Sequence, residues 1–371
     1  MRMKKVLFLI HDLGRGGAEK VLVNLVNRLN HTLFEIHVIA LFGGGVNEQF
    51  LNPDIHFRQV YKKNIPANSK WMKLFTPKQL HKMYIRDHYD IEISYLEGPC
   101  ARIISGCEDT STKLISWVHV EQHTKENASF SFRNYQEALS CYSKFDNIVC
   151  VSDFVKRDFQ SIFDNALNGI TLYNTVESNK ILSLSKQSVS EIQHDGIVKL
   201  IAVGTLKKSK GYERLFRIVK QLVSKGERVC LFVLGEGANY GSLKKYVDDN
   251  SLNENITFLG YQTNPYKFVS KCDLFVCASF SEGFSTAATE ALIVGTPVCT
   301  VDVSGMKEML GENNEYGVVT ENSEEALYEG IKMLLDNPDL LAHYKKQAEI
   351  RGKEFSTEKT VKAVEDMLMS L

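Results

Sequence analysis

The sequence predicts an α/β protein with two doubly wound parallel-sheet domains, and three observations lead to this prediction. The chain has 371 residues, a length suited to two domains of ordinary size. Short β-branched runs alternate with helical stretches, the pattern of parallel βαβ units. This alternation stops at a polar, Ser-rich segment, 173–196, and then starts again. We therefore expect two cores, with ligands bound in a cleft where the carboxyl ends of the two sheets face each other.

The first domain is expected over residues 1–174. Its predicted strands are KVLFLI, FEIHVIAL, DIEISYL, KLISWVH and NIVCVS, and the helical stretch AEKVLVNLVNRL follows the first of them. A linker is expected at 175–196. The second domain, 197–350, has predicted strands IVKLIAVG, RVCLFVLG, NITFLG, DLFVCAS and TPVCTVD. The final segment, 351–371, is expected to form a helix that packs back on the first domain.

Composition narrows the class of protein. Hydrophobic residues make up 44% and charged residues 24% of the chain, which is typical of globular proteins, and the net charge of −1 argues against binding of nucleic acid through overall basicity. The first apolar run, Val6 to Ile10, is too short for a signal peptide. The eight cysteines include no C-x-x-C pair, and several lie in apolar runs. We therefore expect buried thiols in a cytoplasmic protein.

The first candidate site is the loop LGRGGAEK, 13–20, which follows the first strand and opens a helix. Glycine amides there can approach an anion at the positive end of the helix. The loop lacks the spacing of a dinucleotide fingerprint, because Glu19 lies where the third glycine should be. The second strand also ends in Ala40 and Leu41, without an acidic residue for a ribose. An oxidoreductase is therefore disfavoured, and a tight turn without a ligand remains the alternative.

In the second half, VGTLKKSKGYERL joins a strand end to a helix. Lys207, Lys208 and Lys210 surround this turn and could neutralise a diphosphate. The alternative is an ordinary solvated loop.

The segment FSEGFSTAATEALIVGTP, 280–297, has the pattern of a turn followed by a helix capped by Ser285. Amides at the start of such a helix lack partners within the helix and suit phosphate oxygens. Glu290 would lie about 7 to 8 Å further along the helix axis, where it could bind ribose hydroxyls. Glu282, before the helix, could face the sugar on the other side of the phosphates. Two unrelated surface glutamates are the alternative.

Together these segments resemble the retaining glycosyltransferases of glycosyltransferase family 4, which have the GT-B fold of two facing Rossmann-like domains. The resemblance covers nearly the whole chain, through GGAE, YDIEISYLEG, WVH, VCVSDFVK, YNTVE, VGTLKKSKG, LGEG and the run from FLGYQ to VDVSG. The E-x(7)-E signature of the family corresponds to Glu282 and Glu290. A bare glutamate pair is a weak signal, but SEGF followed by TEAL-x-x-GTPV is a specific one.

The resemblance implies roles for matching positions. Glu290 would bind the donor ribose, Glu282 the hydroxyls of the transferred sugar, and Lys210 the leaving phosphate. The family often has an arginine where this chain has Thr205, so we expect Lys207 or Lys208 to supply part of the missing charge. His119 would contact the sugar; without the resemblance, a structural hydrogen bond would be the simpler role. The implied catalytic residues are His119, Lys210 and Glu282, and the implied donor-binding residues are Gly16, Gly17, Thr205, Lys207, Lys208, Gly260, Tyr261, Gln262, Phe284, Ser285, Thr286 and Glu290.

The activity implied is transfer of a hexose or N-acetylhexosamine from a nucleoside-diphosphate sugar, UDP before GDP, to a saccharide acceptor with retention of configuration. The leaving phosphate would accept the acceptor proton, so the two glutamates serve recognition and not the paired chemistry of glycosidases. No D-x-D pattern demands a metal, and no cofactor is expected. The alternatives are a GT-B sugar-nucleotide epimerase or phosphorolytic enzyme, and a catalytically silent scaffold that binds nucleotide sugars.

A basic and aromatic segment, 58–86, suggests the acceptor side. Between Ile55 and Arg86 the chain has no Asp or Glu. Such a segment on a near-neutral protein favours docking to an anionic membrane, here the inner face of the plasma membrane, and then a lipid-linked acceptor in polysaccharide or lipopolysaccharide assembly. A solvated surface beside the acceptor is the alternative. The basic residues are Arg58, Lys62, Lys63, Lys70, Lys73, Lys78, Lys82 and Arg86.

Overall fold

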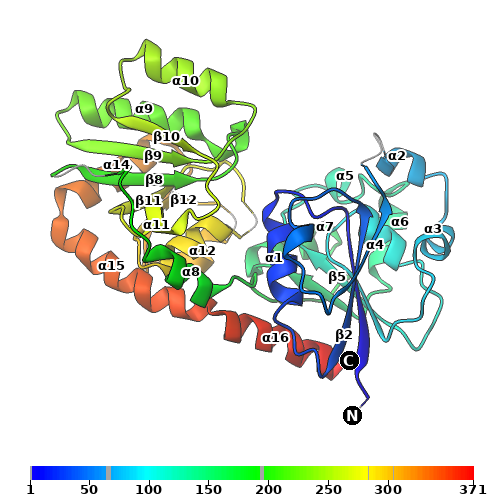
Figure 1. Ribbon diagram of the computed structural model, residues 1–371. Coiled ribbons are helices and arrows are strands. Elements are labelled where there is room, and N and C mark those ends of the chain that lie inside the picture. Colours follow the sequence, from blue (N-terminus) through cyan, green and yellow to red (C-terminus); the bar gives the residue numbers. More distant parts are fainter. Residues whose placement is uncertain (1, 64–67, 193–195, 283, 304) are drawn as a thin grey trace. The chain divides into compact units, whose positions relative to one another are not determined.

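The computed structural model describes residues 2–63, 68–192, 196–282, 284–303 and 305–371. The chain divides into two compact units. The first comprises residues 1–176 together with 358–371, and the second comprises residues 177–357. In Figure 1 the first unit runs from blue to cyan and includes the red helix α16, whereas the second runs from green to orange.

The first unit is built on a seven-stranded sheet in the order β3-β2-β1-β4-β5-β6-β7. All neighbouring strands are parallel. The strand order reverses between β1 and β4, which makes their carboxyl ends the topological switch point of this sheet. The strands are β1 (Lys4–Ile10), β2 (Phe34–Phe42), β3 (His56–Tyr61), β4 (Ile91–Ser94), β5 (Lys113–Val118), β6 (Asn147–Cys150) and β7 (Gly169–Thr171).

Helices cover both faces of this sheet (Figure 1). The central strands are therefore buried on both sides, which explains their nearly continuous apolar sequences, as in Val6–Ile10 of β1. The helices of the unit are α1 (Gly17–Val26), η1 (Glu48–Phe50), α2 (Asn68–Met72), α3 (Pro77–Tyr84), α4 (Pro99–Ile104), α5 (Lys125–Ala128), α6 (Tyr135–Tyr142), α7 (Asp153–Ile162) and α16 (Thr357–Ser370).

The second unit repeats the plan with a six-stranded parallel sheet in the order β10-β9-β8-β11-β12-β13. Its switch point lies between β8 and β11. The predicted fold class, two doubly wound parallel-sheet domains, is confirmed. The strands are β8 (Val198–Val203), β9 (Val229–Leu234), β10 (Ile256–Gly260), β11 (Leu274–Cys277), β12 (Val298–Val301) and β13 (Val318–Thr320). The helices are α8 (Ser178–Ser185), η2 (Lys208–Lys210), α9 (Tyr212–Ser224), α10 (Tyr240–Asp249), α11 (Tyr266–Val269), α12 (Thr286–Ile293), α13 (Met306–Leu310), α14 (Glu324–Asp336), α15 (Pro338–Gly352) and η3 (Lys353–Phe355).

The segment predicted as a linker, 175–196, contains a helix. Within it, α8 belongs to the second unit and packs beside α11: Ser270 Oγ donates to the carbonyl of Ser185 over 2.9 Å, and Asn264 Nδ2 to that of Leu184 over 3.0 Å. Most of α8 is polar, so its few apolar positions, such as the buried Ile181, gave no periodic signal.

The carboxyl-terminal helix α16 lies beside the first sheet (Figure 1). Lys4 Nζ donates to the carbonyl of Leu368 over 3.0 Å, and the amide of Asn30 donates to Glu365 Oε1 over 2.7 Å. Where the chain returns toward the first unit, Ser178 and Thr357 bond each other reciprocally: each backbone amide donates to the other's hydroxyl, over 2.9 and 3.1 Å.

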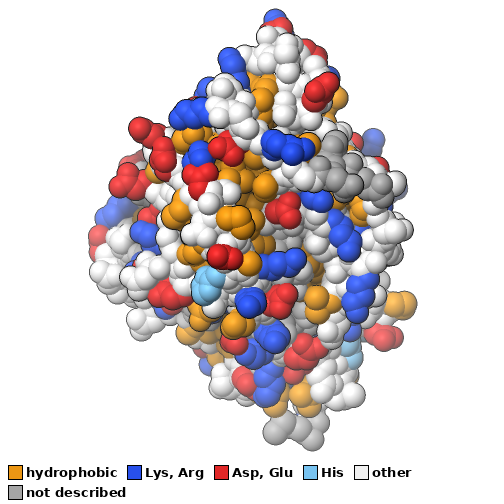
Figure 2. Space-filling model, turned by 90° about the vertical axis from the view of Figure 1, so that its left-hand side faces the viewer, with side chains coloured by type: hydrophobic (Ala, Val, Ile, Leu, Met, Phe, Trp, Pro, Cys, Tyr) orange, Lys and Arg blue, Asp and Glu red, His pale blue; other side chains and the backbone are white. Residues whose placement is uncertain are grey.

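The surface and the thiols follow the expectations from composition. Lys and Arg are intermingled with Asp and Glu over the face drawn in Figure 2, in keeping with the near-neutral net charge. All eight cysteines are free thiols, and seven are buried, the exception being Cys107. Across the described ranges, no helix combines the length and the apolar character that a membrane crossing requires.

Candidate active site

The strongest cluster of predicted residues lies at the switch point of the second sheet. The loop after β8 carries Lys210, and the loop after the neighbouring strand β11 carries Glu282. Lys210 Nζ lies 2.6 Å from Glu282 Oε1, and Ser279 Oγ donates to the same oxygen over 2.6 Å. The fold thus joins two of the three predicted catalytic residues in one ion pair, although 72 residues separate them in sequence.

Gly211 allows the two loops to approach each other. Its φ is +66°, and a Cβ atom at this position would lie 1.8 Å from the carbonyl oxygen of Ala278. Only glycine adopts this conformation readily and leaves room for the facing backbone. The turn therefore sets the position of Lys210, the residue immediately before it.

Sequence reasoning missed Arg214, which holds the same two loops together. This buried arginine donates through Nε to the carbonyl of Ala278 over 2.8 Å and through a terminal nitrogen to that of Ser279 over 2.9 Å. Its guanidinium also lies 4.2 Å from the ring centre of Phe280. Burial lowers the pKa of Arg214 below its usual value. The available signal was an arginine on α9 next to the apolar positions that face the sheet.

Glu290 is buried on α12, and its Oε1 accepts a hydrogen bond from the hydroxyl of Tyr266 over 3.1 Å. Ser285 caps this helix as predicted, with its hydroxyl accepting from the amide of Ala288. Phe284 is buried and makes an edge contact with Phe355, the ring centres being 5.6 Å apart. Since the side chains of Phe284 and Ser285 point into the unit, a ligand would meet these residues through their backbone.

The three lysines after β8 separate into two groups. Lys210 pairs with Glu282, whereas Lys207 and Lys208 line a small pocket of about 40 Å³ that also includes Arg217 and Asn239. Thr205, at the expected arginine position, is exposed at the start of the loop. The idea that Lys207 or Lys208 replaces the arginine charge stays a prediction.

Three of the predicted donor-binding residues, Gly260, Tyr261 and Gln262, lie at the carboxyl end of β10, at an edge of the sheet. Gly260 has a φ of +66°, a Cβ atom added there would meet nothing within 4 Å, and the neighbouring Tyr261 is exposed. Gln262 Nε2 donates to the carbonyl of Leu259 over 2.6 Å. The loop is therefore shaped by a glycine turn that presents an aromatic ring to solvent.

In the first unit, the loop after β1 is organised by a carboxylate. Asp12 Oδ1 accepts from the amide of Gly14 over 2.7 Å, and Asp12 Oδ2 lies 2.8 Å from His11 Nδ1. The hydrogen bond from His11 is the main reason that the pKa of Asp12 is lowered. Gly16 precedes α1, and a Cβ atom there would lie 2.0 Å from Glu19 Oε2. Gly17 is the first residue of the helix.

His119 follows β5 and is buried. Burial lowers its pKa to about 3, so the imidazole is neutral in the physiological range. Its backbone amide donates to Glu97 Oε2 over 3.1 Å, and its ring lies 4.8 Å from that of Tyr95. Its Nε2 atom is buried and has no hydrogen-bond partner among the described residues. A neutral imidazole with an unused polar atom is suited to hydrogen bonding with a ligand.

Sequence reasoning also missed His11, Asp12 and Glu97. His11 and Asp12 come directly after β1, and Glu97 is the third residue after β4; these two strands flank the switch point of the first sheet. Burial raises the pKa of Glu97. Polar residues at the carboxyl ends of buried strands were the signal that could have found them.

Two family models match the chain. The model described as Glycosyltransferase Family 4 matches residues 15–176, and the model described as Glycosyl transferases group 1 matches residues 187–351. These ranges contain every predicted site residue.

Among curated proteins, the chain is 28% identical over the whole of both chains to an N-acetylgalactosamine-N,N'-diacetylbacillosaminyl-diphospho-undecaprenol 4-alpha-N-acetylgalactosaminyltransferase from Campylobacter jejuni. It is 22% identical to the lipopolysaccharide core biosynthesis glycosyltransferase LpsD of Rhizobium meliloti, over 89% of this chain and 88% of that protein.

Solved structures of similar fold include Anabaena HepE in complex with UDP, with a TM-score of 0.76 at 18% identity, covering 99% of this chain and 100% of that one. The sucrose-phosphate synthase of Thermosynechococcus elongatus has a TM-score of 0.81 at 16% identity, covering 99% of each chain. At these identities the likeness establishes the fold.

Proposed function

The chain belongs to glycosyltransferase family 4 and has the GT-B fold, and from this premise we propose that it transfers a hexose or N-acetylhexosamine from a nucleoside-diphosphate sugar to a saccharide acceptor, with retention of configuration. The observation that carries the proposal is the Lys210–Glu282 pair at the switch point of the second sheet, next to the capped start of α12.

The chemistry of these groups suits departure of a nucleoside diphosphate. The ammonium of Lys210 would stabilise the negative charge that develops on the leaving phosphate, and a positioned cation is an effective stabiliser in a partly dehydrated site. The start of α12 would bind diphosphate oxygens through backbone amides. Because Lys210 and the amides of α12 would stabilise the negative charge of the diphosphate, we propose that transfer needs no metal ion or cofactor. Because Thr205 carries no charge where the family often has an arginine, Lys207 and Lys208 would supply the remaining positive charge that the diphosphate needs.

Recognition of the donor would fall to the two glutamates. Glu290, held by the hydroxyl of Tyr266, would accept hydrogen bonds from ribose hydroxyls, and Glu282 would accept them from the transferred sugar. His119, with its neutral ring, would bind the sugar or the acceptor. We propose UDP as the nucleotide, because HepE of similar fold was solved with UDP.

For the acceptor, we propose a lipid-linked saccharide in cell-surface glycan assembly, reached from the inner face of the plasma membrane. The support is the Campylobacter relative, whose name includes a diphospho-undecaprenol acceptor, and the surface of the basic segment. Within the segment Leu74 is 78% exposed, and Lys73 Nζ lies 5.7 Å from the ring centre of Phe130, a residue outside the segment that is 64% exposed. By contrast, Lys78 and Lys82 pair with Glu108, which weakens that part of the segment as a basic surface.

Vesicle sedimentation tests this surface. Wild-type protein should bind vesicles rich in phosphatidylglycerol and not neutral phosphatidylcholine, and Leu74→Ser with Phe130→Ser should reduce the bound fraction. Ile350→Ser, an exposed apolar position in the second unit, is the control. Unchanged binding after substitution of Lys70, Lys73, Lys78 and Lys82 with Glu would defeat the membrane proposal.

A thermal-shift panel tests the function itself. UDP, GDP, ADP and their sugar conjugates are compared on the wild type, on Glu290→Ala and on Glu254→Ala, an exposed control. A ligand at about 100 times its dissociation constant stabilises the folded state by about 2.7 kcal/mol. A shift that depends on the base, is lost in Glu290→Ala and is kept in Glu254→Ala supports the donor site.

Turnover of the matching donor then separates the remaining functions. Transfer requires a saccharide acceptor and gives a product whose anomeric configuration is read by NMR. Donor turnover without a saccharide acceptor would indicate an epimerase or a phosphorolytic enzyme, and donor binding without any turnover would indicate a scaffold.

A further inference from the structure

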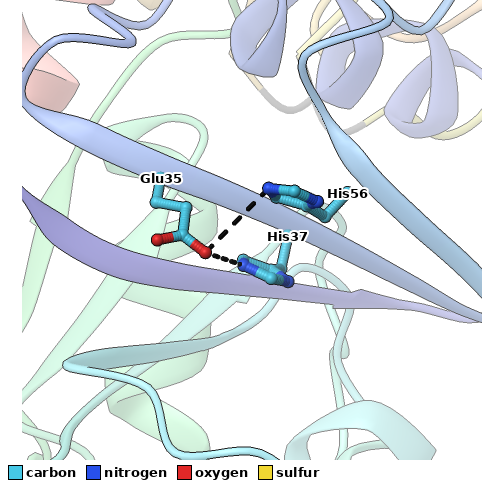
Figure 3. Close-up of side chains that lie close together, drawn as sticks. All are labelled: Glu35, His37 and His56. Atoms are coloured by element: carbon cyan, nitrogen blue, oxygen red, sulfur yellow. Dashed lines mark hydrogen bonds and ion pairs between the residues drawn. The ribbon is translucent and has the colours of Figure 1, made fainter.

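Three side chains with metal-ligand chemistry lie together on the first sheet, away from the loops described above. Glu35 and His37 are on β2, and His56 is the first residue of β3 (Figure 3). Residues two apart on a strand share one face, so Glu35 and His37 point the same way. The parallel register pairs His37 with His56, which brings the third side chain alongside.

The spacing of the ligand atoms suits one ion. Glu35 Oε1 lies 2.7 Å from His37 Nε2 and 3.9 Å from His56 Nε2. Two ligands that bind Zn²⁺ at about 2.0 to 2.1 Å in a tetrahedral arrangement are about 3.4 Å apart. The two observed distances lie on either side of this value. Small side-chain rotations would therefore place all three atoms around a single ion.

The side chains of the two histidines differ in how freely they can rotate. His37 is held between two rings, stacked on His56 with ring centres 4.5 Å apart and in edge contact with Tyr89 at 5.1 Å. His56 is 60% exposed and can turn toward an ion. A hydrogen bond between Glu35 and His37 would be satisfied without His56. The second imidazole, that of His56, is stacked on His37 and faces the same Glu35 oxygen, and this observation points to a shared ion.

Two other groups of possible ligands make weaker sites. In one group, His81 already forms an ion pair with buried Glu92 over 2.8 Å, next to Cys107. Burial alone would lower the pKa of His81, but its interactions with Cys107 and Glu92 outweigh burial and raise this pKa to about 9. The charge of Glu92 is therefore already balanced by a protonated imidazole. The other group is formed by Glu121, His123 and Asp158. There one carboxylate oxygen of Asp158 already accepts hydrogen bonds from the backbone amides of Gln122 and His123.

We propose that Glu35, His37 and His56 bind a divalent transition-metal ion, with Zn²⁺ the best match, at the edge of the first sheet. Two imidazoles and a carboxylate form a ligand set typical of Zn²⁺, with water completing the coordination. The nearby Lys5, which is paired with Glu35 in the sheet register, has its ammonium over the ring of Tyr89 at 5.0 Å.

The position of the site indicates a structural role. The cluster lies near the amino-terminal ends of β2 and β3, whereas the candidate active-site loops follow the carboxyl ends of strands. β3 is an edge strand with hydrogen bonds to one neighbour, β2. An ion bound to both strands would fasten this edge, and because it would bind only the folded chain, it would raise stability.

The test uses the untagged 371-residue chain, stripped of metal with a chelator. Co²⁺ is titrated and followed by its visible absorption, and Zn²⁺ affinity is measured by competition with a chromophoric chelator. We expect one ion per chain. His56→Gln and Glu35→Gln should each weaken binding by more than about tenfold, because even changes in outer-shell partners of a metal cost about 10- to 100-fold.

Matched variants remove the competing groups. Cys107→Ser and His123→Gln should leave the affinity unchanged, and circular dichroism should show that the exposed His56→Gln variant is folded. Hydrogen exchange adds a second readout: Zn²⁺ should slow exchange of amides in β3 in the wild type and not in His56→Gln. The proposal is overturned by absence of stoichiometric binding, by binding that survives both His56→Gln and Glu35→Gln, or by loss of binding in either control variant.

Discussion

Lys210 Nζ lies 2.6 Å from Glu282 Oε1 and so joins the two loops that follow adjacent strands of the second sheet. Both side chains are more than half buried, so this pair is less screened by water than an ordinary surface pair. The same carboxylate that orients the lysine would repel the phosphates of a donor. Glu282 would therefore favour donor binding by positioning Lys210 and oppose it by its negative charge, and binding measurements can separate these two effects.

Replacing Glu282 with Gln should separate the two contributions. The amide keeps the size of the side chain and can still accept a hydrogen bond from Ser279, but the charge is lost. We expect binding of the nucleoside diphosphate itself to be unchanged or tighter, because Lys210 is released from its partner. Binding of the sugar conjugate should weaken, since a charged hydrogen-bond acceptor for its hydroxyls is removed, at a cost of about 1.5 to 3 kcal/mol. Calorimetric titration of both ligands checks this. Equal weakening for both would contradict it.

Arg214→Met should destabilise the second unit. The substitution leaves the carbonyls of Ala278 and Ser279 without their buried donor, at a cost of about 1 to 3 kcal/mol for each unpaired group. Arg217→Met is the matched control on the same helix: its guanidinium is half exposed and pairs with Glu324, a surface interaction worth about 0 to 1 kcal/mol. Urea unfolding followed by circular dichroism measures both variants. Similar losses in the two would show that Arg214 has no special role.

Gly211→Ala should destabilise the protein more than Gly226→Ala. Both glycines have positive φ, +66° and +89°, so both substitutions introduce backbone strain of about 1 to 3 kcal/mol. Only at Gly211 would the new Cβ atom also meet a backbone carbonyl, that of Ala278, whereas nothing lies within 4 Å at Gly226. The difference between the two melting temperatures isolates the close approach. Nucleotide binding should fall only in Gly211→Ala, because that turn positions Lys210.

His119 should make the first unit less stable in mild acid. Its pKa is about 3 in the folded chain, against about 6.5 in an unfolded one. Below pH 6.5 the unfolded chain therefore takes up a proton that the folded chain does not. The free energy of unfolding should fall as the pH is lowered, by about 2 kcal/mol from this group between pH 8 and pH 5. Both tryptophans, Trp71 and Trp117, lie in the first unit, so their fluorescence follows its unfolding in urea.

The comparison with His119→Gln gives the test. The stability difference between the wild type and this variant should change by that amount over the same pH range. His88→Gln, at an exposed position in the same unit, is the matched control. Parallel curves for all three proteins would contradict the low pKa of His119.

The sequence predicted the buried strands better than the exposed ones. Strands such as β1 and β9 are apolar over most of their length, and their apolar runs were sufficient to predict them. We did not predict β3, β7 or β13, which lie at sheet edges. Edge strands face solvent, so they carry polar residues and lose the apolar pattern, as HFRQVY in β3 shows. The polar helix α8 was missed for the same reason.

In the candidate site, the sequence identified residue types but not their partners. The spacing of Glu282 and Glu290 follows from one turn and one helix, and is therefore visible in sequence. The ion pair of Lys210 with Glu282 and the clamp by Arg214 depend on β8 lying next to β11, a relation between distant segments. Local patterns cannot show such contacts. The difference between Lys210 and its neighbours Lys207 and Lys208 has the same origin.

The reciprocal hydrogen bonds of Ser178 and Thr357 have a consequence for how such a chain can be rebuilt. They join the second residue of the second unit to its last residue, so the two ends of this unit lie close together. A segment with adjacent ends can be excised or exchanged as a cassette, because the flanking chain needs to bridge almost no distance. Recombination at 177 and 357 would therefore exchange the second unit while leaving the seven-stranded sheet and residues 358–371 in place.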